Sequence, residues 1–427
     1  MLEKLKKVLL YIIIFKFIVG LISTLGYFSH PHIIRQVDTM SVGLNYWLRW
    51  SDGVSAPSFL HNLLPGSLGG GDTPGITPME FPLLNLFIAP WFSVGHYWGF
   101  SLSFAAVICL NFFLLYVHYK KWNEVSSEFG VASLLMGVFG VSGIYIYRIM
   151  PDFASMVFVS LACAYSFKGR SKYISFLLLS IGLLMKPTSA IVLAILFFRA
   201  GFWRNFIFRD LAWICGGLFV GALYYTKGIS YLSSVSDLSG YFEVGALSPL
   251  EGLYEAFRDL HRLPKLIFKN FFSSWVILPI SLMLVIYRSR IFLWIICVLA
   301  LQVTTIFMID GSHAYGHDYY FIGCSFMVCW LVVQLIQRLK LSPIFLGFCV
   351  LLVIFNVERG IYRLKPIWKS SKREKAVRLL KENPSLRSAR AIQTKTANPP
   401  EKGLLFGKFQ GETKPLSEDI QLELDRF

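Results

Sequence analysis

The amino-acid sequence predicts an all-α protein that crosses a membrane about eleven times. Of its 427 residues, 55% are hydrophobic and only 15% are charged, which leaves more apolar side chain than the interior of a soluble protein can hold. Apolar runs of roughly 17 to 25 residues cross a bilayer as helix, and many runs of about this kind follow one another from residues 9–28 onward. Lys and Arg gather in the short segments between the runs, as in the loops of membrane proteins.

The expected spans are defined by apolarity and by the polar segments that separate them. They run over about residues 9–28, 99–118, 130–147, 153–167, 173–185, 188–198, 211–225, 272–287, 292–309, 321–337 and 343–356. Together they predict a transmembrane domain over residues 1–357, followed by a polar C-terminal tail over residues 358–427. The basic residues of the tail favour the cytoplasm, whereas the span count places it outside, so its side stays open.

Positive charge near the N-terminus sets the orientation. Lys4, Lys6 and Lys7 precede the first span and favour the cytoplasm, so residues of about 29–98 form a long outer loop. Two segments of this loop, about 39–50 and 82–94, are too short to span, and we expect them to be helices in the membrane interface. Five basic clusters agree with one orientation and lie at residues 120–121, 168–172, 199–209, 288–290 and 338–340.

Cysteine content and net charge exclude other classes of protein. The seven cysteines all lie within apolar runs and form no CxxC pair, so neither a disulfide framework nor a zinc site is indicated. The net charge of +16 is explained by basic loops and by attraction to anionic lipid. We therefore expect membrane lipids as partners and no nucleic acid.

Ionisable and polar residues gather on the outer face once this topology is drawn. They are Asp38 at the start of the outer loop, Glu80 near its end, Asp152 at the start of a span, Lys186 between two short spans, and His317-Asp318-Tyr319-Tyr320 before another span. A charged group at membrane depth costs about 2.5 to 3.5 kcal/mol even on the lenient insertion scale. Their gathering on one face therefore predicts a functional site.

The order of five short motifs resembles a known family. The motifs are Arg35-Gln36-Val37-Asp38, Glu80-Phe81-Pro82-Leu83, Met150-Pro151-Asp152, Met185-Lys186-Pro187 and His317-Asp318-Tyr319-Tyr320. Over about residues 1–356 the chain resembles the C superfamily of membrane glycosyltransferases, and most closely the branch of protein O-mannosyltransferases and lipid A aminoarabinose transferases. The resemblance implies a polyprenyl-phosphate sugar donor, an acidic base in the first outer loop and inversion at the anomeric carbon. The sequence departs from the family where an Asp-Glu pair is usual, since Asp38 is followed by Thr39.

The residue types also fit this chemistry by themselves. Inverting transfer needs a carboxylate that takes the proton of the acceptor hydroxyl, so Asp38 is the expected base and Asp152 the second catalytic candidate. The departing phosphate needs positive charge, for which Arg35, Lys186 or a bound cation is suited. Structural roles stay open for three of these residues. Asp38 also suits a helix N-cap, Asp152 the first turn of a helix, and Lys186 a helix end or a snorkelling anchor.

Glu80 and His317 offer oxygen and imidazole ligands, so the sequence suggests a divalent metal cation near the phosphate as a cofactor. His317 as a hydrogen-bonded loop histidine is the alternative. Tyr319 and Tyr320 are expected to bind the donor, by stacking on its sugar or by lining a groove for its lipid. The aromatic belt of the membrane interface is the alternative for this pair.

These observations predict a hexosyl or pentosyl transferase of the cell envelope, multi-pass in a bacterial inner membrane, with its active site on the outer face. It would move a sugar from a polyprenyl-phosphate carrier to a lipid, glycan or protein acceptor. A transporter or flippase of lipid-linked sugars remains an alternative, since buried charge among many spans is also its signature. A glycan polymerase or ligase is the other, because the late outer loop of about 227–270 contains the charged residues Asp237, Glu251, Arg258 and Arg262.

Overall fold

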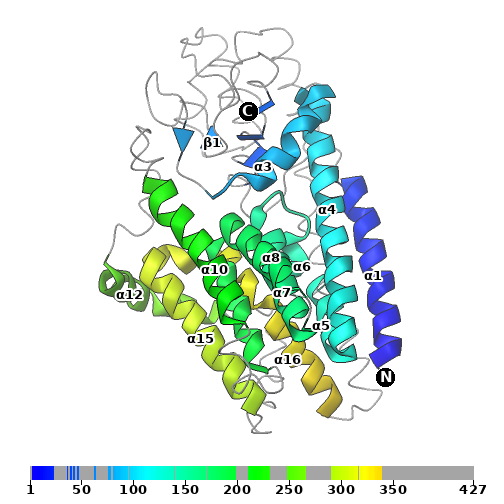
Figure 1. The fold of residues 1–427 in the computed structure, drawn as a ribbon, viewed down its shortest axis with the longest axis vertical. Helices are drawn as coiled ribbons and strands as arrows, with labels where there is room; N and C mark the ends of the chain where they lie inside the picture. Colours follow the sequence, from blue (N-terminus) through cyan, green and yellow to red (C-terminus); the bar gives the residue numbers. More distant parts are fainter. Residues whose placement is uncertain are drawn as a thin grey trace.

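A computed structural model of the chain is shown in Figure 1. The structure describes residues 2–23, 36, 39–40, 42–43, 46–47, 62–63, 76–77, 80–94, 96–138, 140–169, 171–198, 210–230, 248–265, 290–315 and 317–338. The expected spans over 272–287 and 343–356, and the tail over 358–427, lie outside these residues.

Apart from turns and one short pair of strands, the described part of the chain is helical, which confirms the all-α part of the predicted fold class. The α-helices are α1 (Leu2–Ser23), α3 (Leu83–Ile88), α4 (His96–Val125), α5 (Ser127–Met136), α6 (Gly140–Tyr145), α7 (Pro151–Phe167), α8 (Lys172–Met185), α10 (Leu211–Leu223), α12 (Pro249–Arg258), α13 (Leu263–Lys265), α15 (Arg290–Asp310) and α16 (Ser325–Arg338). The tighter 3-10 segments are η2 (Ala89–Val94), η3 (Pro187–Phe198), η5 (Leu260–Arg262), η7 (Gly311–Tyr315) and η8 (Asp318–Cys324), and η4 (Tyr224–Gly228) is a π-helical turn. Strands β1 (Asn62–Leu63) and β2 (Ile76–Thr77) pair antiparallel.

Helix length bears on the expected number of membrane spans. Residues Ser101–Val125 of α4 are long and apolar enough to cross a membrane, and no other helix within the described ranges meets both conditions. Shorter apolar helices coincide with other expected spans, among them Pro151–Phe167, Lys172–Met185 and Cys297–Met308. The figure of about eleven spans therefore stays a prediction.

The expected span over residues 130–147 is divided between α5 and α6, and this corrects the prediction of one continuous helix. The ammonium of Lys16, which is buried in the middle of α1, donates to the carbonyl oxygen of Gly137 at 2.9 Å and to that of Gly143 at 2.8 Å. Carbonyl groups at a helix end lack intrahelical donors. A side chain from a distant helix thus stabilises the break, and the glycines at 137, 140 and 143 are the local signal that weakens the helix here.

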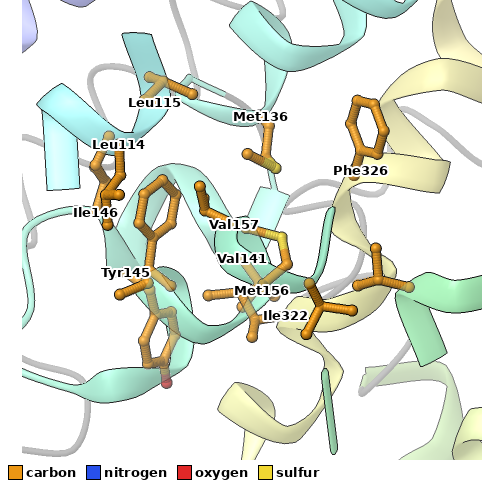
Figure 2. Close-up of a cluster of buried hydrophobic side chains, with 14 of the residues drawn as sticks. Leu114, Leu115, Met136, Val141, Tyr145, Ile146, Met156, Val157, Ile322 and Phe326 are labelled. Carbon is orange, nitrogen blue, oxygen red and sulfur yellow. The ribbon is translucent and has the colours of Figure 1, made fainter. Parts of the chain in front are cut away.

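The helices form a bundle in which α1 and α4 lie along one edge, α10 and α15 along the other, and α7 and α8 between them (Figure 1). The core contains Leu114 and Leu115 of α4, Tyr145 of α6, Met156 of α7 and Phe326 of α16 (Figure 2). Within a bilayer such interfaces are stabilised mainly by van der Waals packing and interhelical hydrogen bonds. This packing fixes the helix ends from which the candidate site is built.

Candidate functional site

The site is built around a helix end that the sequence dictates. Helix α8 stops at Met185 because Pro187 has no backbone N–H and disfavours helical geometry at the residue before it. Lys186 accordingly has an extended backbone, and its N–H donates to the carbonyl of Gly182 at 2.9 Å. The chain then continues as η3. Lys186 is therefore held in a break between two apolar segments, with its side chain 7% exposed.

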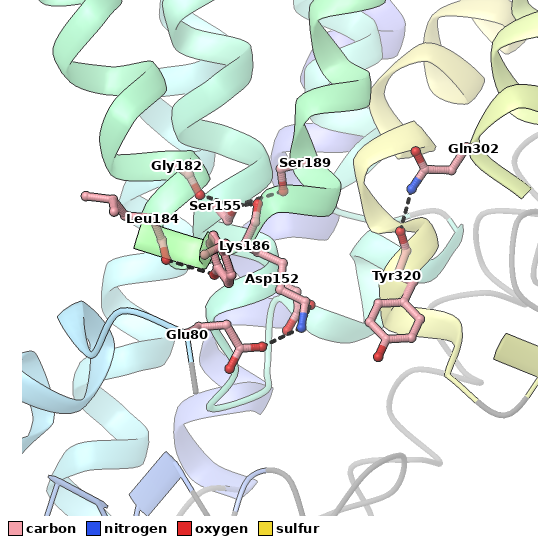
Figure 3. A network of polar contacts seen from close by, with 10 residues as sticks. Glu80, Asp152, Ser155, Gly182, Leu184, Lys186, Ser189, Gln302 and Tyr320 are labelled. Carbon is pink, nitrogen blue, oxygen red and sulfur yellow. Dashed lines mark hydrogen bonds and ion pairs between the residues drawn. The ribbon is translucent and has the colours of Figure 1, made fainter. Parts of the chain in front are cut away.

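Glu80 reaches Lys186 from the segment just before α3. Its Oε1 atom lies 2.5 Å from Lys186 Nζ, and its side chain is 11% exposed (Figure 3). The backbone N–H of Phe81 donates to the carbonyl of Leu184 at 3.2 Å, and Tyr225 donates to the same carbonyl at 3.0 Å. The segment that carries Glu80 is thus joined directly to the end of α8, which fixes the ion pair in place.

Asp152 lies on the other side of the same ammonium. It stands in the first turn of α7 after Pro151, its side chain is fully buried, and its Oδ1 atom is 3.9 Å from Lys186 Nζ. This distance is too long for a hydrogen bond, but at an effective dielectric constant of about 20 it gives roughly 4 kcal/mol of attraction before the desolvation cost. The carboxylate at the start of α7 and the ammonium at the end of α8 also complement the two helix dipoles.

Two tyrosine rings complete the surroundings of Lys186. Its Nζ atom lies 5.0 Å from the ring centre of Tyr319 and 5.2 Å from that of Tyr320, within the range of cation–π attraction. His317 stacks on Tyr319 with ring centres 5.3 Å apart. Gln302 of α15 donates to the backbone carbonyl of Tyr320 at 2.8 Å and so holds this segment in position (Figure 3).

The structure therefore brings together six of the predicted site residues, from four separate parts of the chain. They are Glu80, Asp152, Lys186, His317, Tyr319 and Tyr320. Asp38 and Arg35 lie outside the described residues. The catalytic, donor-binding and metal-binding roles assigned to these residues stay predictions.

Sequence reasoning missed the residues that support this cluster. Ser155, Ser189, Tyr225 and Gln302 bond to backbone or side-chain groups within it. The one local signal is that Ser155 follows Asp152 by three residues, and therefore lies on the same face of α7. The other contacts join segments far apart in sequence, so no motif contains them.

The metal hypothesis depends on oxygen and nitrogen ligands near Lys186. Among the residues that the structure describes, no group of three or more His, Cys, Asp or Glu side chains is arranged to hold a metal ion. The Glu80 and Asp152 carboxylates are gathered around the single ammonium of Lys186. With both carboxylates ionised this trio has an excess of one negative charge, which a cation would offset.

Two charged residues of the predicted late outer loop, Glu251 and Arg262, have structural partners. Glu251 completes a capping box at the start of α12, and hydrogen bonds with Ser248, first of all with its side chain, hold the pKa of Glu251 below its ordinary value. Arg262 pairs with Asp259 at 3.3 Å. These groups stabilise the ends of α12 and η5, while Asp237 lies outside the described residues.

The fold and the site define a class: a helical protein rich in apolar helices, with a buried ion-paired cluster where two helix ends and two loops meet. Comparison with solved structures finds a similar chain, described as ArnT from Cupriavidus metallidurans bound to undecaprenyl phosphate. The match has a TM-score of 0.43 and 12% sequence identity, and it covers 92% of this chain and 67% of that chain. ArnT is a lipid A aminoarabinose transferase. No protein-family model matches the sequence, and no curated protein matches it.

Proposed function

We propose that this chain is an integral membrane glycosyltransferase that takes a sugar from a polyprenyl-phosphate carrier. The transfer takes place on the outer face of the membrane and inverts the anomeric carbon. The observation that carries the proposal is the buried ammonium of Lys186, held between the carboxylates of Glu80 and Asp152 and facing two tyrosine rings. Such a cluster is costly within a membrane protein and is typical of a functional site.

The reaction assigns a separate task to each kind of group. A carboxylate takes the proton of the acceptor hydroxyl, and the acceptor oxygen attacks the anomeric carbon from the face opposite the phosphate. The bond between that carbon and the phosphate oxygen breaks, and polyprenyl phosphate departs with the electron pair. Asp38 is the proposed base, with Asp152 next, because both belong to the motifs at the outer ends of predicted spans.

Lys186 is suited to the departing phosphate. An ammonium in a site that excludes water stabilises the charge that develops on a leaving oxygen. Its ammonium donates to Glu80 at 2.5 Å, so a bound phosphate must share or replace that carboxylate. An arriving phosphate also adds negative charge to a trio that already has an excess carboxylate, which supports the proposal of a divalent cation beside Glu80 and His317.

The aromatic rings suit the sugar or the lipid of the donor. Tyr319 and Tyr320 have ring centres 4.6 Å apart and form one wall of the cluster. Aromatic faces bind the apolar face of a sugar ring and exclude water from the reacting bond. A transporter would place comparable polar groups near the middle of its spans, whereas these lie at the start of α7 and the end of α8.

The test is transfer from defined donors. Purified protein in closed proteoliposomes is incubated with radiolabelled polyprenyl-phosphate sugars and membrane acceptors, and the anomeric configuration of the product is compared with that of the donor. The matched control for Lys186→Gln is Lys121→Gln, because Lys121 also pairs with a carboxylate, Glu124 at 3.2 Å, and lies 5.5 Å from the ring centre of Tyr165. We expect Lys186→Gln to lower turnover by roughly a hundredfold or more and Lys121→Gln to leave it unchanged. Uptake or flipping of the donor without transfer would refute the proposal.

A further inference from the structure

We infer that Ser155 is a positioning residue, whose hydroxyl holds the backbone around Lys186 so that the ammonium stays between Glu80 and Asp152. The consequence for catalysis rests on the function proposed above. The placement itself rests on hydrogen bonds between α7 and the end of α8, and it can be tested without any reaction.

The Ser155 hydroxyl lies at the centre of the break at Lys186. Its Oγ atom is 2.7 Å from the carbonyl oxygen of Gly182, 3.2 Å from the carbonyl oxygen of Lys186 and 2.8 Å from Ser189 Oγ (Figure 3). A serine has one proton to donate and two lone pairs to accept. The shortest distance fits donation to Gly182, while the hydroxyl of Ser189 donates to Ser155.

The carbonyl of Gly182 is the acceptor that Lys186 itself uses. The Lys186 N–H donates to it at 2.9 Å, so Ser155 and Lys186 bond to the same oxygen. In addition, the Ser189 N–H donates to the Lys186 carbonyl at 3.2 Å. The two serines thus bond to backbone groups on both sides of the residue whose ammonium defines the site.

The surroundings leave little freedom for another arrangement. Ser155 and Ser189 are fully buried. A Cβ atom added at Gly182 would lie 2.6 Å from Val159 Cγ2 and 3.0 Å from the Ser155 carbonyl, so α7 and α8 are in close contact at this point. The hydroxyl of Ser155 therefore bonds to the backbone at the end of α8, which is packed closely against α7, the helix that carries Ser155.

Ser155 also connects the segments that carry the two charged residues of the site. It follows Asp152 by three residues on α7, whereas Lys186 ends α8. The hydrogen bonds of one side chain thus connect the helix that carries the carboxylate with the segment that carries the ammonium. The separation of 3.9 Å between Lys186 Nζ and Asp152 Oδ1 depends on this connection.

A second serine provides a matched control. Ser175 of α8 is also buried, and it bridges the same two helices by donating to the carbonyl of Ala162 in α7 at 3.1 Å. It lies near the beginning of α8, whereas Lys186 follows the end of that helix. Ser155→Ala and Ser175→Ala therefore each remove a hydrogen bond between α7 and α8. Only Ser155→Ala is expected to displace Lys186.

The test is solid-state NMR of the full chain in lipid bilayers, with ¹⁵N-labelled lysine and ¹³C-labelled Asp and Glu carboxyl groups. The Lys186 signal is assigned by its loss in Lys186→Gln, and its contact with carboxyl carbon is measured by dipolar dephasing. We expect Ser155→Ala to weaken the dephasing at Lys186 and to shift or broaden its signal, while Ser175→Ala leaves both as in the parent. An unchanged Lys186 signal in Ser155→Ala, or an equal change in both variants, overturns the inference.

Kinetics on the same samples separate this inference from the proposed function. A small displacement of a catalytic ammonium lowers kcat by roughly tenfold to a hundredfold, so we expect that loss in Ser155→Ala with little change in donor KM, and no loss in Ser175→Ala. If the Lys186 contact changes as expected but the parent transfers no sugar, the proposed function fails and the positioning role stands. If the parent transfers sugar but the Lys186 contact is unchanged in Ser155→Ala, the positioning role fails and the proposed function stands.

Discussion

Breaking the pair of Glu80 and Lys186 is expected to destabilise the protein far more than breaking an ordinary surface ion pair. Their atoms lie 2.5 Å apart with side chains 11% and 7% exposed, and Asp152 is fully buried beside them. Lys186→Gln would leave two carboxylates close together in a site that excludes water. Removing one partner of a buried pair costs about 3 to 5 kcal/mol, and we expect a loss of unfolding free energy in that range.

A double-mutant cycle isolates the pair itself. Glu80→Gln combined with Lys186→Gln leaves neutral amides that can still form a hydrogen bond, so the double variant should lose less than the sum of the single losses. For residues in direct contact the coupling is about 0.5 to 3 kcal/mol, and burial places our expectation in the upper half of that range. The half-buried pair of Lys121 and Glu124, at 3.2 Å, should show roughly 1 kcal/mol or less.

Unfolding in mixed micelles with a rising fraction of denaturing detergent measures these differences, and transfer is measured on the same samples. The double variant should recover part of the lost stability but no turnover, because an amide cannot balance the charge of a departing phosphate. A coupling no larger than that of Lys121 with Glu124 would show that water screens the Glu80–Lys186 pair, and the case for a desolvated charged site would fail.

Three further predictions concern the base, the cation and the topology. Asp38→Asn should lower turnover by roughly a hundredfold or more at unchanged donor affinity, and a rate within a few-fold of the parent would move the role to Asp152. Exhaustive chelation should lower the rate, and Glu80→Gln should weaken the dependence on added metal; full activity after chelation would end the metal hypothesis. A cysteine placed at Gly70 should react with an external thiol reagent and one placed at Lys172 should not, and external labelling at Lys172 would invert the predicted orientation.

The gathering of these residues could be expected from sequence because their motifs stand at the ends of successive predicted spans. Charged residues at the ends of successive spans must lie on one of two faces, and counting spans assigns the face. Glu80, Asp152, Lys186 and the Tyr319–Tyr320 pair do meet around one ammonium. The prediction gave the residues but not their partners, since it coupled Glu80 to a metal whereas the described contact is with Lys186.

Of the two helix breaks, the one between α5 and α6 was harder to predict because it is stabilised by a residue far away in sequence. Pro187 announces the end of α8, but the break between α5 and α6 depends on Lys16, whose ammonium bonds to Gly137 and Gly143 more than a hundred residues further along the chain. Apolar composition continues across that break, so a hydropathy pattern predicts one span. A lysine inside an apolar helix indicates that the lysine needs a buried partner, but it does not identify that partner.

The structural and functional explanations of the site residues are connected by the chemistry of helix ends. The last carbonyl groups of α8 need donors from outside the helix, and Phe81 provides one at Leu184. That hydrogen bond brings the neighbouring carboxylate of Glu80 to Lys186. Likewise the first turn of α7 favours an acid, and this preference places Asp152 beside the same ammonium. The helix dipoles alone would explain an acid at Asp152 and a lysine at Lys186. Neither of these two explanations requires Glu80 and two tyrosine rings at the same nitrogen. The gathering of all five is what favours a site that binds a phosphate and a sugar.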